Sequence, residues 1–199
     1  SMGHSIFQQD GVDLDRSVHC PFKSPEEVLS FDPVEEYGLP DEEERAAYFQ
    51  SVYEQGQSSY PGQVHPGGYY KTLFSACIDA FGWDMFLSAA PLDYERFDRV
   101  LEGFFRITLA NCRAWARTSI PFFICHDDIV WISGPVFHPE WYRQYVFPRY
   151  ARLWEPLKQA GKKVLFCSDG DFTIFTDDLA RAGADGFIFE PLTSLEQIA

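Results

Sequence analysis

Three short apolar runs in the second half of the chain constrain its fold more than any other feature. They span residues 121–125, 163–167 and 186–189, and segments with the apolar spacing of helices separate them. A short, continuous apolar run is typical of a strand that is buried on both faces. Because strands that alternate with helices form βαβ units, the pattern predicts a parallel sheet and the α/β fold class.

Each of these predicted strands leads into charged residues. His126, Asp127 and Asp128 follow the first run, Asp169 follows the second, and Glu190 follows the third. In barrels and open sheets of the α/β class, ligands bind at the carboxyl ends of the strands. The sequence therefore predicts an enzyme-like site at this edge of the sheet.

Helical spacing predicts the elements between the strands. The expected helices span residues 41–55, 72–81, 83–89, 93–118, 139–161 and 172–182. Gly56 and Gly82 are expected to end the first and second of them, and Asp93 is expected to cap the long fourth helix. Pro148 should break or kink the helix that begins at Pro139, because a proline inside a helix removes a hydrogen bond and clashes with the preceding turn.

The amino-terminal part has a different composition from the rest of the chain. Residues 1–60 contain thirteen Asp and Glu but only three Lys and Arg, and contribute −10 of the formal net charge of −14. Four prolines interrupt residues 1–40, which we expect to form an irregular acidic arm with one helical turn after Ser24. We expect residues 41–199 to form a partial α/β barrel domain.

Charge and composition exclude several classes of partner. A net charge of −14 argues against nucleic acid and against an anionic membrane, since binding to either depends on cationic contacts. No run approaches the roughly 18 apolar residues that a membrane span needs. The five cysteines are odd in number and widely spaced, which favours a reduced protein without a disulfide framework. The sequence therefore predicts a cytoplasmic protein.

Several motifs between residues 19 and 199 are specific when their order and spacing are taken together. They are Asp127-Asp128-Ile129 with residues 133–135 and 138–140, residues 145–150 with 158–164, and residues 167–171 with 182–186 and 190–191. In this order they resemble the uroporphyrinogen decarboxylase-like superfamily. The resemblance implies a TIM (β/α)8 barrel and membership among decarboxylases or corrinoid-linked methyltransferases.

The decarboxylase branch of this superfamily fits the sequence poorly. Its members carry an arginine-rich segment near the start that grips the acidic side arms of the porphyrinogen. Here the first sixty residues contain only Arg16 and Arg45. A substrate with many carboxylates would also be repelled by an acidic protein. A decarboxylase therefore remains an alternative to the methyltransferase branches.

The zinc-dependent methyltransferase branch has a His-x-Cys motif at the strand end that matches residues 164–167. Cys167 and Asp169 stand at the corresponding positions in this chain. Thiolate and carboxylate are both zinc ligands, so the resemblance leaves zinc possible with these two residues as its ligands.

A third branch has Ser-Asp-Gly at this strand end, and residues 168–171 resemble it most closely. This resemblance implies corrinoid-linked methyl transfer from a methylated or methoxylated small molecule, with the corrinoid carried by a partner protein. The protein would then protonate the leaving oxygen or nitrogen. We expect catalytic roles for Asp169, His126 and Asp127, and substrate-binding roles for Asp128, Glu190, Gly170 and His65.

The positions of these residues along the chain suggest which of them face the site. Adjacent residues on an extended chain point to opposite sides, and we expect Asp127 to face the site and Asp128 to be structural. Gly170 would let the backbone come close to a ligand. Tyr69, Tyr70 and Trp131 are candidates to line a pocket, although aromatic residues at such positions more often belong to a core.

The length of the chain does not match a complete barrel. A TIM barrel typically needs about 250 residues, and this chain has 199 with three clear strands. We expect an incomplete barrel with exposed strand edges, and therefore a homodimer or a complementing chain. A non-catalytic, truncated homologue that binds a partner or ligand is the alternative from another functional class.

Overall fold

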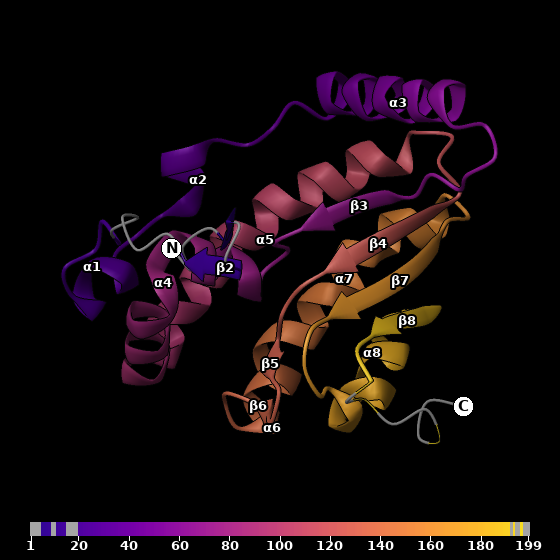
Figure 1. Ribbon diagram of the computed structural model, residues 1–199. Helices are drawn as coiled ribbons and strands as arrows, with labels where there is room; N and C mark the ends of the chain where they lie inside the picture. Colours follow the sequence, from indigo (N-terminus) through magenta and orange to yellow (C-terminus); the bar gives the residue numbers. More distant parts are fainter. Residues whose placement is uncertain (1–4, 9–10, 15–19, 192, 194–195, 197–199) are drawn as a thin grey trace.

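The computed structural model describes residues 5–8, 11–14, 20–191, 193 and 196. Its main sheet contains four strands in the order β3 (Gly67–Tyr70), β4 (Phe122–His126), β7 (Lys163–Ser168) and β8 (Gly186–Phe189) (Figure 1). All three neighbouring pairs are parallel. The three strands expected from the apolar runs are confirmed, and the α/β class with them.

Two antiparallel pairs lie outside the main sheet. They are β1 (Ser5–Gln8) with β2 (Gly11–Leu14), and β5 (Val130–Trp131) with β6 (Gly134–Pro135). The second pair follows the carboxyl end of β4. It therefore forms part of the loop at the edge where the sequence places the site.

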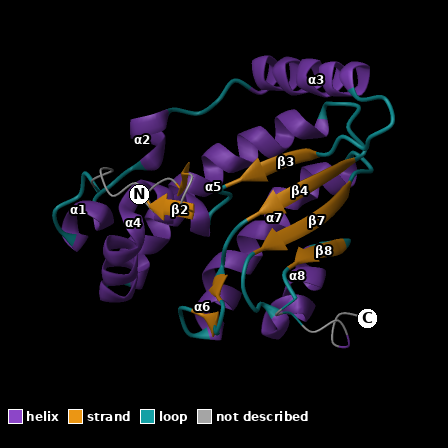
Figure 2. Cartoon of the chain, in the orientation of Figure 1, coloured by secondary structure: helices purple, strands orange, loops and turns teal. Residues whose placement is uncertain are grey.

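Helices precede the first strand of the main sheet and connect its successive strands (Figure 2). They are α1 (Pro25–Leu29), α2 (Pro33–Tyr37), α3 (Glu42–Ser59), α4 (Phe74–Ala89), α5 (Tyr94–Ala116), α6 (Pro139–Trp141), α7 (Phe147–Gln159) and α8 (Thr176–Ala182). Short 3₁₀ turns span Ala90–Leu92 and Thr173–Phe175, and a π-helical turn spans Tyr142–Val146.

The strand order follows the order of the chain, from β3 through β4 and β7 to β8. A barrel has this order, whereas a doubly wound sheet reverses it at a switch point. The four parallel strands in the described part of the chain do not close into a barrel. The structure therefore supports an α/β sheet with barrel-like order, and the complete TIM barrel remains a prediction.

One face of the main sheet is buried and the other is more open. Phe123 and Val164 are at most 2% exposed, whereas Ile124 and Leu165, on the opposite face, are only partly buried. Figure 1 shows α7 behind β4 and β7. The covered face therefore supplies the core, and the opposite face of the sheet is less well covered.

The long helix matches its prediction closely. Asp93 caps α5, and its Oδ1 accepts a hydrogen bond of 3.0 Å from the backbone N–H of Arg96. The predicted apolar stripe is buried along its whole length: Phe97, Val100, Leu101, Phe104, Thr108, Cys112 and Trp115. Burial of this stripe holds α5 against the sheet.

Two glycines, Gly82 in α4 and Gly56 in α3, affect their helices in different ways. Gly82 has φ of +72° and kinks α4, so the predicted break between its halves is present. The prediction that Gly56 ends α3 is wrong, because α3 continues to Ser59. At Gly56 a Cβ would lie 2.9 Å from Nδ1 of His65. Gly56 therefore permits close packing of the following loop.

The acidic amino-terminal part contains two short helices with side-chain caps. Ser24 caps α1, in the place where one helical turn was predicted, and Asp32 caps α2. Phe22 and Phe31 make edge-to-face contacts with Phe81 at centroid distances of 5.0 and 5.6 Å. The division into an arm (residues 1–40) and a barrel domain (residues 41–199) remains a prediction. Across the described residues, helices that combine the length and the apolarity of a bilayer span are absent.

Candidate active site at the carboxyl ends of the strands

A cavity of about 530 Å³ lies beyond the carboxyl ends of β3, β4, β7 and β8, at the edge where the sequence predicts a site. Its lining combines carboxylates with aromatic and aliphatic side chains: Tyr70, Trp83, Asp128, Val130, Trp131, Ile132, Asp169, Gly170 and Glu190. Three of the residues that the sequence places in the site, Asp128, Asp169 and Glu190, therefore contribute carboxylates to one cavity.

Asp127 lies beneath this cavity and is completely buried. Its carboxylate accepts hydrogen bonds from the backbone N–H groups of Leu73 and Phe74 at 3.0 Å and of Ser75 at 2.6 Å. The hydroxyl of Tyr150 donates a fourth, at 2.6 Å. Asp127 therefore caps the start of α4, where the positive end of the helix dipole also favours a carboxylate.

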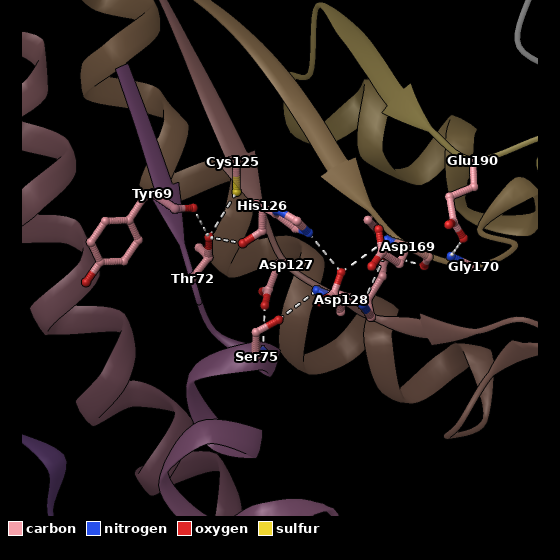
Figure 3. Close-up of polar contacts among 12 residues, drawn as sticks. Tyr69, Thr72, Ser75, Cys125, His126, Asp127, Asp128, Asp169, Gly170 and Glu190 are labelled. Carbon is pink, nitrogen blue, oxygen red and sulfur yellow. Dashed lines mark hydrogen bonds and ion pairs between the residues drawn. The ribbon is translucent and has the colours of Figure 1, made fainter. Parts of the chain in front are cut away.

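Asp128 points the other way and lines the cavity (Figure 3). Its backbone N–H donates to Oγ of Ser75 at 2.7 Å, and its Oδ1 lies 3.0 Å from Nε2 of His126. The backbone N–H of Asp169 donates to the same Oδ1 at 3.1 Å. The expected orientation of the two aspartates is thus reversed, because residues 126 and 128 share the open face of the chain while Asp127 faces the helices.

His126 and Asp128 stabilise each other as an ion pair. Burial lowers the pKa of His126, but the hydrogen bond and negative charge of Asp128, together with the charge of Asp169, outweigh it and raise that pKa. Burial raises the pKa of Asp128, but the hydrogen bonds from His126 and from the Asp169 amide outweigh it and lower that pKa. The ring of His126 also meets that of Tyr70 at 4.1 Å. His126 is absent from the cavity lining and acts on it through Asp128.

Asp169 presents an unpartnered carboxylate to the cavity. In the described part of the chain no hydrogen bond or ion pair reaches this carboxylate, although its backbone N–H is fixed by Asp128. Partial burial and the negative charges of Asp128 and Glu190 raise its pKa, against a smaller opposing effect of His126. Asp169 is therefore the cavity residue best suited to exchange a proton with a ligand.

Glu190 and Gly170 close the far side of the cavity. Oε2 of Glu190 accepts a hydrogen bond of 3.1 Å from the backbone N–H of Gly170. Gly170 has φ of +81°, and a Cβ there would lie 2.5 Å from the carbonyl oxygen of Trp131. Gly170 was expected to let a ligand approach the backbone, but the group that approaches it is the backbone of Trp131.

His65 and Cys167 do not belong to the cavity lining. His65 precedes β3 and therefore lies at the opposite end of that strand, with Nε2 3.0 Å from the carbonyl oxygen of Tyr60. Its expected role in substrate binding does not fit this position. Cys167 is half-buried in β7, and partial burial with the charges of Asp169 and Asp128 raises the pKa of its thiol to about 11.

One set of candidate metal ligands lies in the described part of the chain. The ligand atoms of His126, Asp128 and Asp169 all fall within 4.8 Å of one another. An imidazole with two carboxylates is a donor set that zinc accepts. Cys167 is outside this set, so the residues that the structure brings together differ from the Cys167–Asp169 pair that the resemblance implies.

The sequence offers Tyr70 and Trp131 as pocket residues, with a core position as the more common alternative, but gives no such indication for Trp83. Trp83 and Trp131 meet in an edge-to-face arrangement at a centroid distance of 5.4 Å. Tyr70 and Trp131 are 53% and 49% exposed, which sets them apart from core residues. The position of Trp83 directly after the kink at Gly82 is the signal that could have distinguished it.

Comparisons with known proteins support the fold and leave the family open. No family model and no curated protein matches the chain. A solved structure of a methyltransferase from Methanosarcina mazei is similar, with a TM-score of 0.55 and 13% sequence identity. The alignment covers 72% of this chain and 40% of the solved one. The chain thus has a fold like part of this methyltransferase, and the similarity does not by itself identify a superfamily.

Proposed function

We propose that this chain carries the methyl-donor site of a methyltransferase of the uroporphyrinogen decarboxylase-like type. It would act in corrinoid-linked methyl transfer from a methylated or methoxylated small molecule. The observation that carries the proposal is the unpartnered carboxylate of Asp169 in a cavity at the ends of parallel strands. The fold similarity to a methyltransferase is consistent with it.

The size of the cavity suits a small methyl donor. A volume of about 530 Å³ falls within the range of small-molecule pockets. Trp131 and Ile132 are 49% and 73% exposed at its rim and offer apolar surface for a corrinoid that a partner protein presents at the mouth. Such a corrinoid, with cobalt in a low-valent state, supplies the nucleophile that accepts the methyl group.

The side chains of this chain would orient the methyl donor and supply a proton to its leaving heteroatom. Asp169 faces the leaving heteroatom and donates a proton to an oxygen or a neutral nitrogen, since neither leaves readily as an anion. Asp128 holds the backbone of Asp169 through a hydrogen bond of 3.1 Å, and His126 in turn holds Asp128. His126 and Asp128 are thus positioning residues for Asp169. No step of this proposal uses zinc.

The negative charge of the cavity lining argues against the decarboxylase alternative. Asp128, Asp169 and Glu190 supply three carboxylates, and the part of the chain that the structure describes adds no Lys or Arg to the lining. A substrate with several carboxylates would meet like charges at close range, which costs binding free energy.

The test is a methyl-transfer assay with the 199-residue protein and cob(I)alamin. Loss of cob(I)alamin absorbance is followed after addition of methoxylated aromatics, methylated amines or methylated thiols. Protein-dependent methylation of the corrinoid by one of these classes is the expected result. Release of carbon dioxide from a carboxylated substrate, without methyl transfer from any donor, would replace the proposal with the decarboxylase.

A further inference from the structure

The charged side chains that line the cavity are carboxylates. Asp128, Asp169 and Glu190 line the cavity, and among the described residues its lining contains neither Lys nor Arg. The nearest basic residue in the sequence, Lys71, is turned to Asp79, with 2.6 Å between Nζ and Oδ1. Among the described residues, the cationic partner of these carboxylates is His126, which pairs with Asp128. Asp169 and Glu190 keep their charge available to a ligand.

Aromatic rings form much of the remaining wall. Tyr70, Trp83 and Trp131 line the cavity together with the three carboxylates. The rings of Trp83 and Trp131 are inclined at 66° to each other, so they present different faces and edges to the space beside them. Indole and phenol rings attract cations over their faces, and quaternary ammonium groups are bound in this way in aromatic cages.

We propose that the cavity binds an organic cation and that its methyl donor is an N-methylated ammonium group. An N-methyl surface packs against Tyr70 and the two tryptophans, while the positive charge lies near Asp169 and Glu190. The cavity of about 530 Å³ has room for such a group and a short substituent. Calling the cation a methyl donor rests on the proposed function, whereas its binding does not.

An ammonium donor also fits the chemistry of transfer. When the methyl group passes to the cobalt of the corrinoid, the C–N bond breaks and the C–Co bond forms. The electron pair of the C–N bond stays on nitrogen, so the amine leaves neutral and needs no new proton. For this substrate class Asp169 serves as the counter-ion of the donor, and its proton-donor role applies to ethers.

Other ligand classes use only part of this wall. An anionic donor would face three carboxylates without a basic partner. A divalent metal ion would use His126, Asp128 and Asp169 but would leave the aromatic rings without a function. An organic cation alone engages both the carboxylates and the rings.

Calorimetric titration with choline tests the proposal without a corrinoid or a partner protein. The matched control is the neutral analogue of choline, which has a quaternary carbon in place of the nitrogen. EDTA is added to chelate divalent metal ions. We expect choline to bind at least about ten-fold more tightly than its analogue. Equal affinity for the two, or no binding of choline, would overturn the proposal.

Variants locate the binding and separate it from catalysis. Trp131→Leu should weaken choline binding by about five-fold or more, as loss of a cation–π contact does. Tyr48→Leu, which removes an aromatic residue that is 56% exposed on α3, should leave binding unchanged. If choline affinity is the same in Trp131→Leu as in the unmodified protein, the aromatic wall is not the site.

Binding and transfer can fail separately. Choline that binds but never methylates cob(I)alamin would count against the methyl-transfer function and leave the cation site standing. Conversely, the protein could transfer a methyl group from a methoxylated compound and fail to bind choline. That result would support the methyl-transfer function and overturn the cation site.

Discussion

Gly170 shows how one residue shapes the candidate site. Its φ of +81° lies in the left-handed region, and a Cβ would come within 2.5 Å of the Trp131 carbonyl oxygen. The backbone N–H of Asp171 donates to the same carbonyl at 3.2 Å. Gly170 therefore lets the loop that carries Trp131 pack directly onto the strand end that carries Asp169.

Gly170→Ala should be more destabilising than a glycine substitution that meets only backbone strain. Gly161 is the matched control, since its φ is +74° and nothing lies within 4 Å of an added Cβ. We expect Gly161→Ala to lower the free energy of unfolding by about 1–2 kcal/mol, from strain alone. Gly170→Ala should lose about 2 kcal/mol more, because the clash is with backbone. Equal losses in urea denaturation would show that the loop does not pack on Gly170.

The sequence could identify the acidic pair at positions 127 and 128 but not assign its two sides. Alternation along an extended chain places Asp127 and Asp128 on opposite faces. Which face is buried depends on where the helices pack, and the preceding run is apolar on both sides. The structure settles this through Phe123 and Cys125, which face the helices together with Asp127.

The start of α4 depends on a carboxylate from a distant part of the sequence. The residue at its own N-cap position, Leu73, provides no side-chain hydrogen bond. Asp127 supplies the cap from the end of β4, and Oγ of Ser75 accepts a hydrogen bond from the backbone N–H of Asp128. The site loop and α4 therefore support each other.

Asp127→Asn should lower the free energy of unfolding by about 2–4 kcal/mol, since the amide group turns a donor toward donors that the carboxylate satisfies. Tyr150→Phe removes one of the same hydrogen bonds and should cost about 1 kcal/mol. Thermal unfolding of both variants measures the difference. If Asp127→Asn is no more destabilising than Tyr150→Phe, the carboxylate does not hold α4 in this way.

The turn between α8 and β8 contains a second structural carboxylate. Partial burial raises the pKa of Asp185, but hydrogen bonds from Lys158, from the Val164 amide and from Lys163 outweigh it and lower that pKa to about 2. The bond from Val164 is 2.9 Å long. Asp185 thus joins α7 and β7 to the strand that follows.

This lowered pKa predicts an acid-dependent loss of stability. The contribution of ionised Asp185 is fully present above its unfolded value of 3.8 and is lost as the pH falls through about 2. The unmodified protein should therefore be more stable than Asp185→Asn at pH 5, and the gap should close as the pH is lowered toward 2. A gap in urea denaturation midpoints that does not change with pH would contradict the ion pair.

Helix boundaries were predictable where local chemistry decides them. Asp93 begins α5 as expected, because an aspartate cap acts within a few residues. The expected break at Pro148 is present: regular α-helix is interrupted by the π-helical turn Tyr142–Val146, and α7 begins directly after it. Pro148 lies in the first turn of α7, where its missing N–H costs little. The π-helical form of the interruption depends on packing and leaves no pattern in the sequence.

The main sheet has open edges in the part of the chain that the structure describes. The outer edges of β3 and β8 pair with no other described strand. Open edges and a partly exposed sheet face favour association with another chain. We propose a homodimer or a complementing chain as the partner of this sheet.

Light scattering after size-exclusion chromatography tests this proposal on the 199-residue protein. The expected result is twice the monomer mass, with a shift toward monomer on dilution. A stable monomer at all concentrations, with a cooperative unfolding transition, would show that the open edges need no partner.

At the scale of the molecule, the sequence predicts the fold class better than the closure of the sheet. Alternating strands and helices specify the α/β class, and the strand order observed is that of a barrel. Closure depends on pairing between strands far apart in the chain, and the described part contains four parallel strands. The position of the cavity follows from parallel strands alone, while its aromatic wall depends on the packing of α4 against the loop after β4.

The measurement that tests the account most directly is the rate of cob(I)alamin methylation by Asp169→Asn. Asp177→Asn is the control, because it makes the same substitution at an exposed position on α8. We predict that Asp169→Asn folds normally and loses methyl transfer from a methoxylated donor at least about 100-fold, while Asp177→Asn keeps the rate of the unmodified protein. Unchanged methyl transfer by a folded Asp169→Asn protein would remove Asp169 from the site and contradict the proposed function.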